Sequence, residues 1–173
     1  MKMGDGGFRP AYNIQYATDA DTRAIVGVEV TNAGSDAHQM IPMLAQIEAR
    51  LDRLPNEHLV DGGYVNFEAI EDAAVRDVAV FAPVPAPRNE GIDPHAPKPG
   101  EHGSVSEWRE RMATDEAKET YKDRAATSET TNAHQRQMGM TELLVRGVEK
   151  VTCVALLGAL THNVMLAVAA GLT

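Results

Sequence analysis

Apolar and polar residues alternate along two short stretches near the start of the sequence, and this period of two predicts β-strands. In residues 11–18, Tyr12, Ile14 and Tyr16 fall on one face. Residues 24–30 alternate in the same way and are rich in β-branched valine. Because the polar link between the two stretches is short, we expect an antiparallel hairpin.

A helical spacing replaces this alternation in residues 37–51, where apolar side chains recur every three or four positions. The spacing predicts an amphipathic helix with Pro42 in its first turn and Ser35 or Asp36 as its cap. Further along, a buried strand is predicted at residues 58–60, a helix at 67–75 and a strand at 78–84. This order of elements calls for an α/β fold, with helices packed on a mixed sheet.

Six prolines between residues 83 and 99 interrupt the pattern, and the stretch 83–103 is expected to form an extended, mobile excursion. A long helix should follow from Ser104 or Ser106 to about Gln137, and a last helix should run from Thr141 to about Gly171. The chain therefore divides into a sheet portion at 1–82, a Pro-rich loop at 83–103 and a helical portion at 104–173.

The end of the chain, residues 151–172, carries no charged side chain and is long enough to cross a bilayer. Thr161, His162 and Asn163 lie in its middle, and no aromatic belt flanks it. These features favour a buried core helix over a membrane span.

The 173 residues suffice for one domain, and their composition is that of an ordinary globular protein. The single cysteine, Cys153, excludes a disulfide framework and a cysteine-based zinc site, and it fits a reducing, cytoplasmic location. A net charge of −9 argues against nucleic-acid binding when taken alone. Residues 1–97 account for −8 of it, however, whereas residues 98–150 are nearly neutral and hold most basic side chains that could meet phosphates.

Asp61 is the first candidate for chemistry, because it ends a predicted strand and two glycines follow it. Open α/β sheets place their sites at such strand ends, and a carboxylate there suits Mg²⁺. A plain Asp-Gly-Gly turn explains the same residues. Glu129, Asn132 and Arg136 share one helix face, which suits a metal and phosphate site and equally suits a solvated surface.

Several motifs together resemble the DDE transposases of bacterial insertion sequences. Residues 6–15 and 29–36 are similar to the family's strand entries, and residues 59–64 are similar to its strand ending in Asp-x-Gly-Tyr. Tyr121, Arg124 and Glu129, followed by Arg136, resemble the signature that carries the family's final glutamate. Residues 144–151 and the later His162-Asn163 resemble its C-terminal end.

The resemblance implies an RNase H-like fold whose three carboxylates hold two Mg²⁺ or Mn²⁺ ions and attack DNA phosphodiesters. Asp61 and Glu129 would be two of these catalytic metal ligands. Tyr121, Arg124, Asn132 and Arg136 would support them, and the Pro-rich stretch occupies the place of insertions that touch DNA in related transposases. The side chains expected to contact DNA are Lys122, Arg124, Arg136, Arg146 and Lys150.

The sequence departs from the family in two places. One residue more than in the commonest form separates Arg124 from Glu129, and Arg136 stands where a lysine is usual. The family's first catalytic aspartate lies on a strand before the Gly-Gly-Phe loop, and the aspartates Asp5, Asp19 and Asp21 do not match it. We therefore expect a truncated sheet, incomplete at its N-terminus, and no DNA cleavage by this chain alone.

The expected partners are double-stranded DNA, as transposon ends and target, and a second copy or a full-length transposase at the open sheet edge. No membrane partner is expected. An alternative is a non-catalytic remnant that acts as a protein- or DNA-binding module. A metal-dependent phosphohydrolase built around Asp61 would need His38 or His58 as a further ligand.

Overall fold

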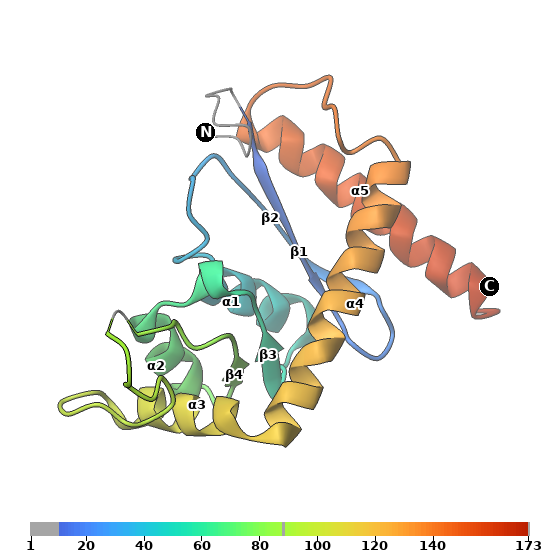
Figure 1. Cartoon of the computed structure of the whole chain (residues 1–173). Coiled ribbons are helices and arrows are strands. Elements are labelled where there is room, and N and C mark those ends of the chain that lie inside the picture. The colour runs from blue at the N-terminus through green and yellow to red at the C-terminus, as the bar shows by residue number, and fades with distance from the viewer. Residues whose placement is uncertain (1–10, 88, 173) are drawn as a thin grey trace. The chain divides into compact units, whose positions relative to one another are not determined.

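A computed structural model describes residues 11–87 and 89–172, so Asp5 and most of the first matching motif lie outside the described residues (Figure 1). The contacts divide the chain into two compact units. Ser35–Ala125 form one, called the inserted unit here. The segments on either side of it form the other, called the hairpin unit.

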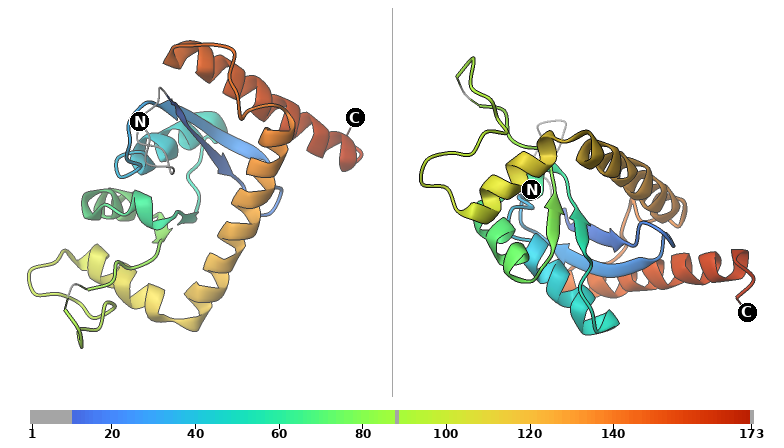
Figure 2. Two further views of the ribbon diagram at one scale, coloured as in Figure 1. Left: turned by 45° about the horizontal axis from the view of Figure 1, so that its top comes forward. Right: turned by 90° about the horizontal axis from the view of Figure 1, so that it is seen from below.

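The hairpin unit contains the antiparallel pair that the alternating pattern predicts. Strand β1 (Asn13–Thr18) pairs with β2 (Ile25–Thr31), and Ile14 lies opposite Val30. Helix α5 (Val148–Ala169) runs along this pair, as both views in Figure 2 show. The predicted hairpin is therefore confirmed.

Helix α5 buries only one of its faces. Val151, Ala155 and Ala159 pack against Val28 and Val30 of β2, while most side chains on the opposite face are exposed. This differs from the expected core helix, because a two-stranded hairpin covers one side of a helix and no more. Among the described residues, α5 is the one helix long and apolar enough to cross a membrane by length and composition.

Helix α4 (Asp115–Gln137) lies against the hairpin through a polar stripe. The Tyr16 hydroxyl donates to Gln135 Oε1 at 3.2 Å, and the hydroxyls of Thr18 and Thr131 are 3.1 Å apart. Burial at this contact raises the pKa of Tyr16 to about 12. Because the buried side chains of α4 at this contact are polar, the sequence of α4 shows no helical spacing of hydrophobic residues that would predict the contact.

The long helix predicted after Ser104 is interrupted in the structure. Helix α3 (Gly103–Ala113) ends before Thr114, and α4 begins at Asp115. Thr114 has extended backbone angles, and its hydroxyl accepts from Ala117 N at 3.1 Å. A side-chain cap of this kind starts a new helix without any proline or glycine.

The inserted unit places two short parallel strands among three helices. Strand β3 (Glu57–Leu59) pairs with β4 (Ala79–Phe81). Helices α1 (Met40–Leu51) and α2 (Phe67–Val75) follow the predicted periods, and α3 completes the layer. The buried core of this unit includes Met40, Leu44, Ile70, Ala73, Val80, Phe81, Val105 and Trp108.

These strands confirm an α/β chain with the predicted element order, but the expected single mixed sheet is wrong for the described residues. Strands β1 and β2 form one two-stranded sheet, and β3 and β4 form another. Each strand pairs along one edge only, and no described strand bridges the outer edges of the two pairs to join them into one sheet.

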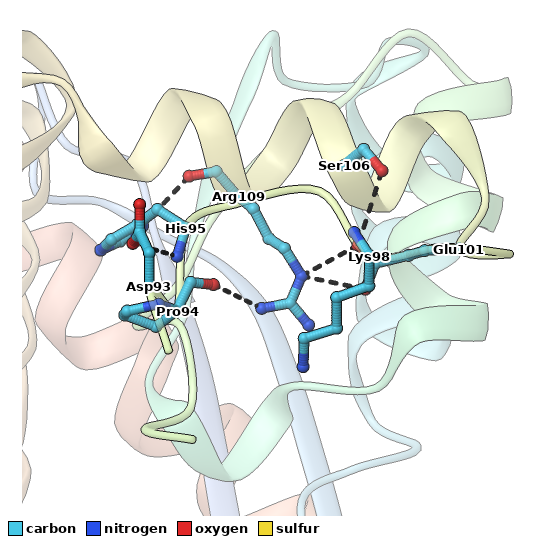
Figure 3. A network of polar contacts seen from close by, with 7 residues as sticks. All are labelled: Asp93, Pro94, His95, Lys98, Glu101, Ser106 and Arg109. Carbon is cyan, nitrogen blue, oxygen red and sulfur yellow. Dashed lines mark hydrogen bonds and ion pairs between the residues drawn. The ribbon is translucent and has the colours of Figure 1, made fainter. Parts of the chain in front are cut away.

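The Pro-rich stretch is attached to α3 rather than being the free excursion that its composition predicts (Figure 3). The Arg109 side chain is 1% exposed, and its Nε donates to both Glu101 carboxylate oxygens at 2.9 and 3.0 Å. Its Nη1 donates to the Pro94 carbonyl at 2.8 Å. The Arg109 carbonyl accepts from His95 Nδ1 at 3.1 Å. One buried guanidinium therefore holds residues 94–101 in place.

Candidate functional site

Asp61 lies two residues after the end of β3 and is the N-terminal cap of the short 3-10 turn η1 (Gly62–Tyr64). The Val60 amide donates to the Phe81 carbonyl at 2.9 Å, which holds the chain beside β4 up to this point. The Asp61 carboxylate then accepts from Gly63 N at 2.8 Å through Oδ1. Asp61 is thus both a turn cap and a half-buried carboxylate at the strand end.

A second carboxylate, that of Asp36, lies beside Asp61. A Cβ atom added to Gly63 would sit 3.0 Å from Asp61 Oδ1 and 3.5 Å from Asp36 Oδ2. The space around Gly63 is therefore bounded by both carboxylates, whereas a Cβ on Gly62 would meet nothing. The sequence assigned Asp36 only a capping role, because no spacing rule connects it with Asp61.

Tyr64, Tyr121 and Arg124 lie near the two carboxylates of the inserted unit. Burial raises the pKa of Tyr64, the charges of Asp36 and Asp61 raise it further, and the Arg124 guanidinium opposes them. These effects show that the two carboxylates and the cation lie near one phenol.

Tyr121 connects Arg124 with the strand that precedes Asp61. Its hydroxyl donates to the Val60 carbonyl at 3.1 Å, and the Arg124 guanidinium lies 5.5 Å from the centre of its ring. Burial raises the pKa of Tyr121, and the charge and hydrogen bond of Arg124 counteract that rise. The Arg124 Nε is buried and has no hydrogen-bond partner among the described residues. An N–H group in that position suits an anionic oxygen supplied from outside the protein.

The donor set is compatible with Mg²⁺, which prefers carboxylate oxygens and is commonly held by one or two carboxylates together with substrate phosphates. Asp36 and Asp61 would provide the carboxylates, and Arg124 would face the phosphate. Within residues 11–87 and 89–172, no group of three or more histidine, cysteine, aspartate or glutamate side chains could hold a metal ion. Within the inserted unit, the possible protein ligands of a metal ion are therefore the two carboxylates of Asp36 and Asp61.

Glu129, Asn132 and Arg136 are all exposed on α4, as expected for residues that share one face. Thr127, Thr131 and Gln135 form the buried side of the same helix segment. Glu129 belongs to the hairpin unit and Asp61 to the inserted unit. The structure thus brings Tyr121 and Arg124 together around Asp61, and the sharing of a metal by Asp61 and Glu129 stays a prediction.

The remaining predicted DNA contacts are exposed. Lys122 forms an ion pair with Glu119 one helical turn before it, and this hydrogen bond raises the pKa of Lys122. Arg146 lies before α5, and Lys150 lies in its first turn. Their exposure leaves all three cations accessible to a phosphate chain.

The two histidines considered as further ligands of Asp61 have other surroundings. Burial lowers the pKa of His58 to about 4, which keeps its imidazole neutral. His38 is exposed, and its Nδ1 lies 3.3 Å from the Asn66 side-chain amide. Neither takes part in a group of metal-binding side chains in the described part of the chain.

Carboxylates beside a partly buried guanidinium are typical of proteins that act on phosphate esters. Residues 97–166 match the family model described as a transposase DDE domain. The match spans α3, α4 and most of α5, and so includes Tyr121, Arg124, Glu129 and Arg136. The match supports the prediction of a DDE-type transposase for this part of the chain. No curated protein and no solved structure matches the chain.

Proposed function

We propose that this chain takes part in the cleavage and transfer of DNA strands during transposition, with Mg²⁺ or Mn²⁺ as cofactor and an RNase H-like arrangement of its catalytic part. The observation that carries the proposal is the convergence of Asp36 and Asp61 beside Arg124. The family match on residues 97–166 supports it independently. A cytoplasmic location, with access to chromosomal DNA, follows from such a role.

The metal-binding side chains would be Asp61, with Asp36 beside it, and Glu129. When bound, divalent ions would polarise the phosphate and stabilise the attacking and leaving oxygens. Asp61 is suited to this role because its backbone is fixed by β3 and its carboxylate by the Gly63 amide. Gly63 keeps the space between the two carboxylates clear of a side chain.

The cationic side chains would bind and orient the DNA. The buried Nε of Arg124 would donate to a phosphate oxygen, and Tyr121 holds that guanidinium in place. Lys122, Arg136, Arg146 and Lys150 are exposed and would contact the backbone, where each contact adds salt-dependent affinity. Asn132, on the same face as Glu129, would support its carboxylate.

Metal binding tests the first part of this proposal. Mn²⁺ binding is measured by electron paramagnetic resonance in the presence of a short DNA duplex. We expect Asp61→Asn to weaken Mn²⁺ affinity at least tenfold, since a ligand is lost. Asp72→Asn is the matched control, because Asp72 is an exposed aspartate on α2. Equal affinities for wild type and Asp61→Asn would refute the metal site.

DNA binding tests the second part and is measured by fluorescence anisotropy with a labelled duplex at several salt concentrations. Arg136→Gln should weaken binding and reduce the salt dependence by about one phosphate contact. Arg76→Gln, at an exposed arginine after α2, is the control. DNA binding combined with an unchanged Mn²⁺ affinity in Asp61→Asn would favour the non-catalytic binding module. Absence of salt-dependent binding would exclude the strand-transfer function and a DNA-binding module, and would leave only a protein-binding module.

A further inference from the structure

Two histidines of the hairpin unit, His134 on α4 and His162 on α5, face each other through the same ring nitrogen. Their Nδ1 atoms lie 3.3 Å apart, and the centres of their rings lie 5.2 Å apart. The His162 side chain is 1% exposed, whereas His134 is half-buried, so an ion from solvent can reach the pair on the His134 side. Neither histidine has a role in the function proposed above.

The hairpin turn fixes which nitrogen of His162 carries the proton. His162 Nε2 lies 2.9 Å from the Arg23 carbonyl, and because a carbonyl only accepts, Nε2 must be the protonated nitrogen. In the neutral ring the lone pair is then on Nδ1, the atom nearest His134. Two lone pairs directed at each other across 3.3 Å repel, so the gap holds one positive centre, either the Nδ1 proton of His134 or a metal ion.

This support of His162 is of the kind that metal-binding histidines have in proteins. Such a histidine donates its second ring N–H to a carboxylate, a backbone carbonyl or water, which fixes the ring and its tautomer. The Arg23 carbonyl does this for His162. The next residue, Asn163, accepts from Ile25 N at 2.7 Å and donates to the Ile25 carbonyl at 2.8 Å, which holds this part of α5 on β2. His162 is thus oriented before any ion binds.

The two distances between the rings match those of two imidazoles on one tetrahedral metal ion. With metal–nitrogen bonds of about 2.0–2.1 Å, the two nitrogens lie about 3.3–3.4 Å apart and the ring centres about 5.1–5.3 Å apart. A straight N–H···N hydrogen bond of the observed length would separate the ring centres by about 5.6 Å. The observed 5.2 Å agrees with the first arrangement. The 50° between the ring planes is compatible with it, because rotation about a metal–nitrogen bond changes neither distance.

The spacing and the ligand type together indicate Zn²⁺. Imidazole nitrogen suits Zn²⁺, Cu²⁺ and Ni²⁺, whereas Mg²⁺ prefers oxygen ligands. Neighbouring nitrogens of a square-planar Cu²⁺ or Ni²⁺ ion, with bonds of about 2.0 Å, lie only about 2.8 Å apart. The 3.3 Å between the two Nδ1 atoms therefore fits a tetrahedral ion.

We propose that His134 and His162 bind one Zn²⁺ ion through their Nδ1 atoms and that this ion joins α4 to α5. On binding, His134 releases its Nδ1 proton and takes one up at Nε2, so its ring stays neutral. No larger group of metal-binding side chains occurs in the described part of the chain, so water completes the coordination and the affinity is below that of four-ligand zinc sites. The Arg23 guanidinium does not face the ion, because it donates to Thr127 Oγ1, about 10 Å before His134 along α4.

Isothermal titration calorimetry with Zn²⁺ on the full chain tests the site. All variants carry Cys153→Ser, because an exposed thiolate binds zinc by itself. We expect His134→Gln to raise the zinc dissociation constant more than about tenfold, since one of the two protein ligands is lost. Glutamine keeps an N–H donor for His162, and circular dichroism verifies that the helices persist. His38→Gln is the matched control at an exposed histidine of the inserted unit and should leave the affinity unchanged.

Nitrogen-15 NMR of the imidazole rings identifies the atoms that bind. Zn²⁺ should shift the Nδ1 resonances of both His134 and His162, while His162 Nε2 keeps its proton, and excess Mg²⁺ should shift neither. Equal zinc affinities of His134→Gln and its parent, an equal loss in His38→Gln, or unshifted Nδ1 resonances would overturn the proposal and leave the pair as a hydrogen bond only. The measurement uses no DNA, so its outcome is independent of the function proposed above.

Discussion

The buried ion pair between Arg109 and Glu101 gives the sharpest stability prediction. Both side chains are almost fully buried, at 1% and 8% exposure, and the guanidinium makes two hydrogen bonds to the carboxylate. The Arg109 guanidinium carbon also lies 5.4 Å from the Phe67 ring centre and 5.5 Å from that of Trp108. Arg109→Met removes the charge and keeps a side chain of similar length.

The expected cost comes mainly from the partner that is left behind. Glu101 would remain buried without its cation, and breaking a buried pair in this way costs about 3–5 kcal/mol. A typical domain has a free energy of unfolding of roughly 5–15 kcal/mol, so the inserted unit would lose a large fraction of its stability. Replacing both partners, as in Arg109→Met with Glu101→Leu, removes the unpaired charge and should recover about 2 kcal/mol or more.

Urea unfolding followed by tryptophan fluorescence measures this loss selectively. Trp108 is the chain's single tryptophan and is completely buried in the inserted unit, so its emission reports that unit. Arg76→Met, at an exposed site, should change the unfolding free energy by less than about 0.5 kcal/mol. A cost below about 1 kcal/mol for Arg109→Met, or a double variant no more stable than the single one, would refute the reasoning.

Three further outcomes are expected. Tyr121→Phe should lower the unfolding free energy of the inserted unit by about 1–2 kcal/mol, because the Val60 carbonyl loses its hydrogen-bond donor. Trp108 fluorescence in urea measures this loss, and an unchanged unfolding midpoint would contradict the prediction. Burial lowers the pKa of His58 from 6.5 to about 4, so on acidification the unfolded chain binds a proton at His58 before the folded chain does. The free energy of unfolding should therefore fall as the pH drops from 6.5 to 4, by up to about 3 kcal/mol. His58→Leu should lose that part of the pH dependence, which unfolding curves across this range would reveal. Asn163→Ala should lower the free energy of unfolding by about 2–4 kcal/mol, because the backbone N–H and C=O of Ile25 both lose their hydrogen-bond partner. Hydrogen exchange at the Ile25 amide should become faster, and unchanged protection would count against the contact.

Much of the local structure could be predicted from the sequence, because its signals are periodic. The hairpin, α1 and α2 each bury one face, and burial of one face imposes a period of two or 3.6 on the sequence. Asp61 could be selected because it follows an apolar strand and precedes two glycines. The common face of Glu129 and Arg136 follows from helix geometry alone.

The partners within the site could not be predicted, because they are far apart in the sequence. Asp36 comes 25 residues before Asp61, and only the fold of the inserted unit brings their carboxylates to the same glycine. The hydrogen bond from Tyr121 to the Val60 carbonyl connects residues 61 positions apart. Composition made the Pro-rich stretch look mobile, whereas a buried arginine attaches it to α3.

The sequence by itself determined the class of elements, their order, the position of Asp61 at a strand end and the signature around Glu129 that resembles the one in DDE transposases. These features depend on neighbours within a few residues or on a local repeat, and the residue types record them directly. The tertiary structure decided how the strands pair, which carboxylate stands beside Asp61 and which face of α5 stays exposed. Those outcomes depend on contacts between distant segments, and no local pattern of hydrophobicity or charge specifies them.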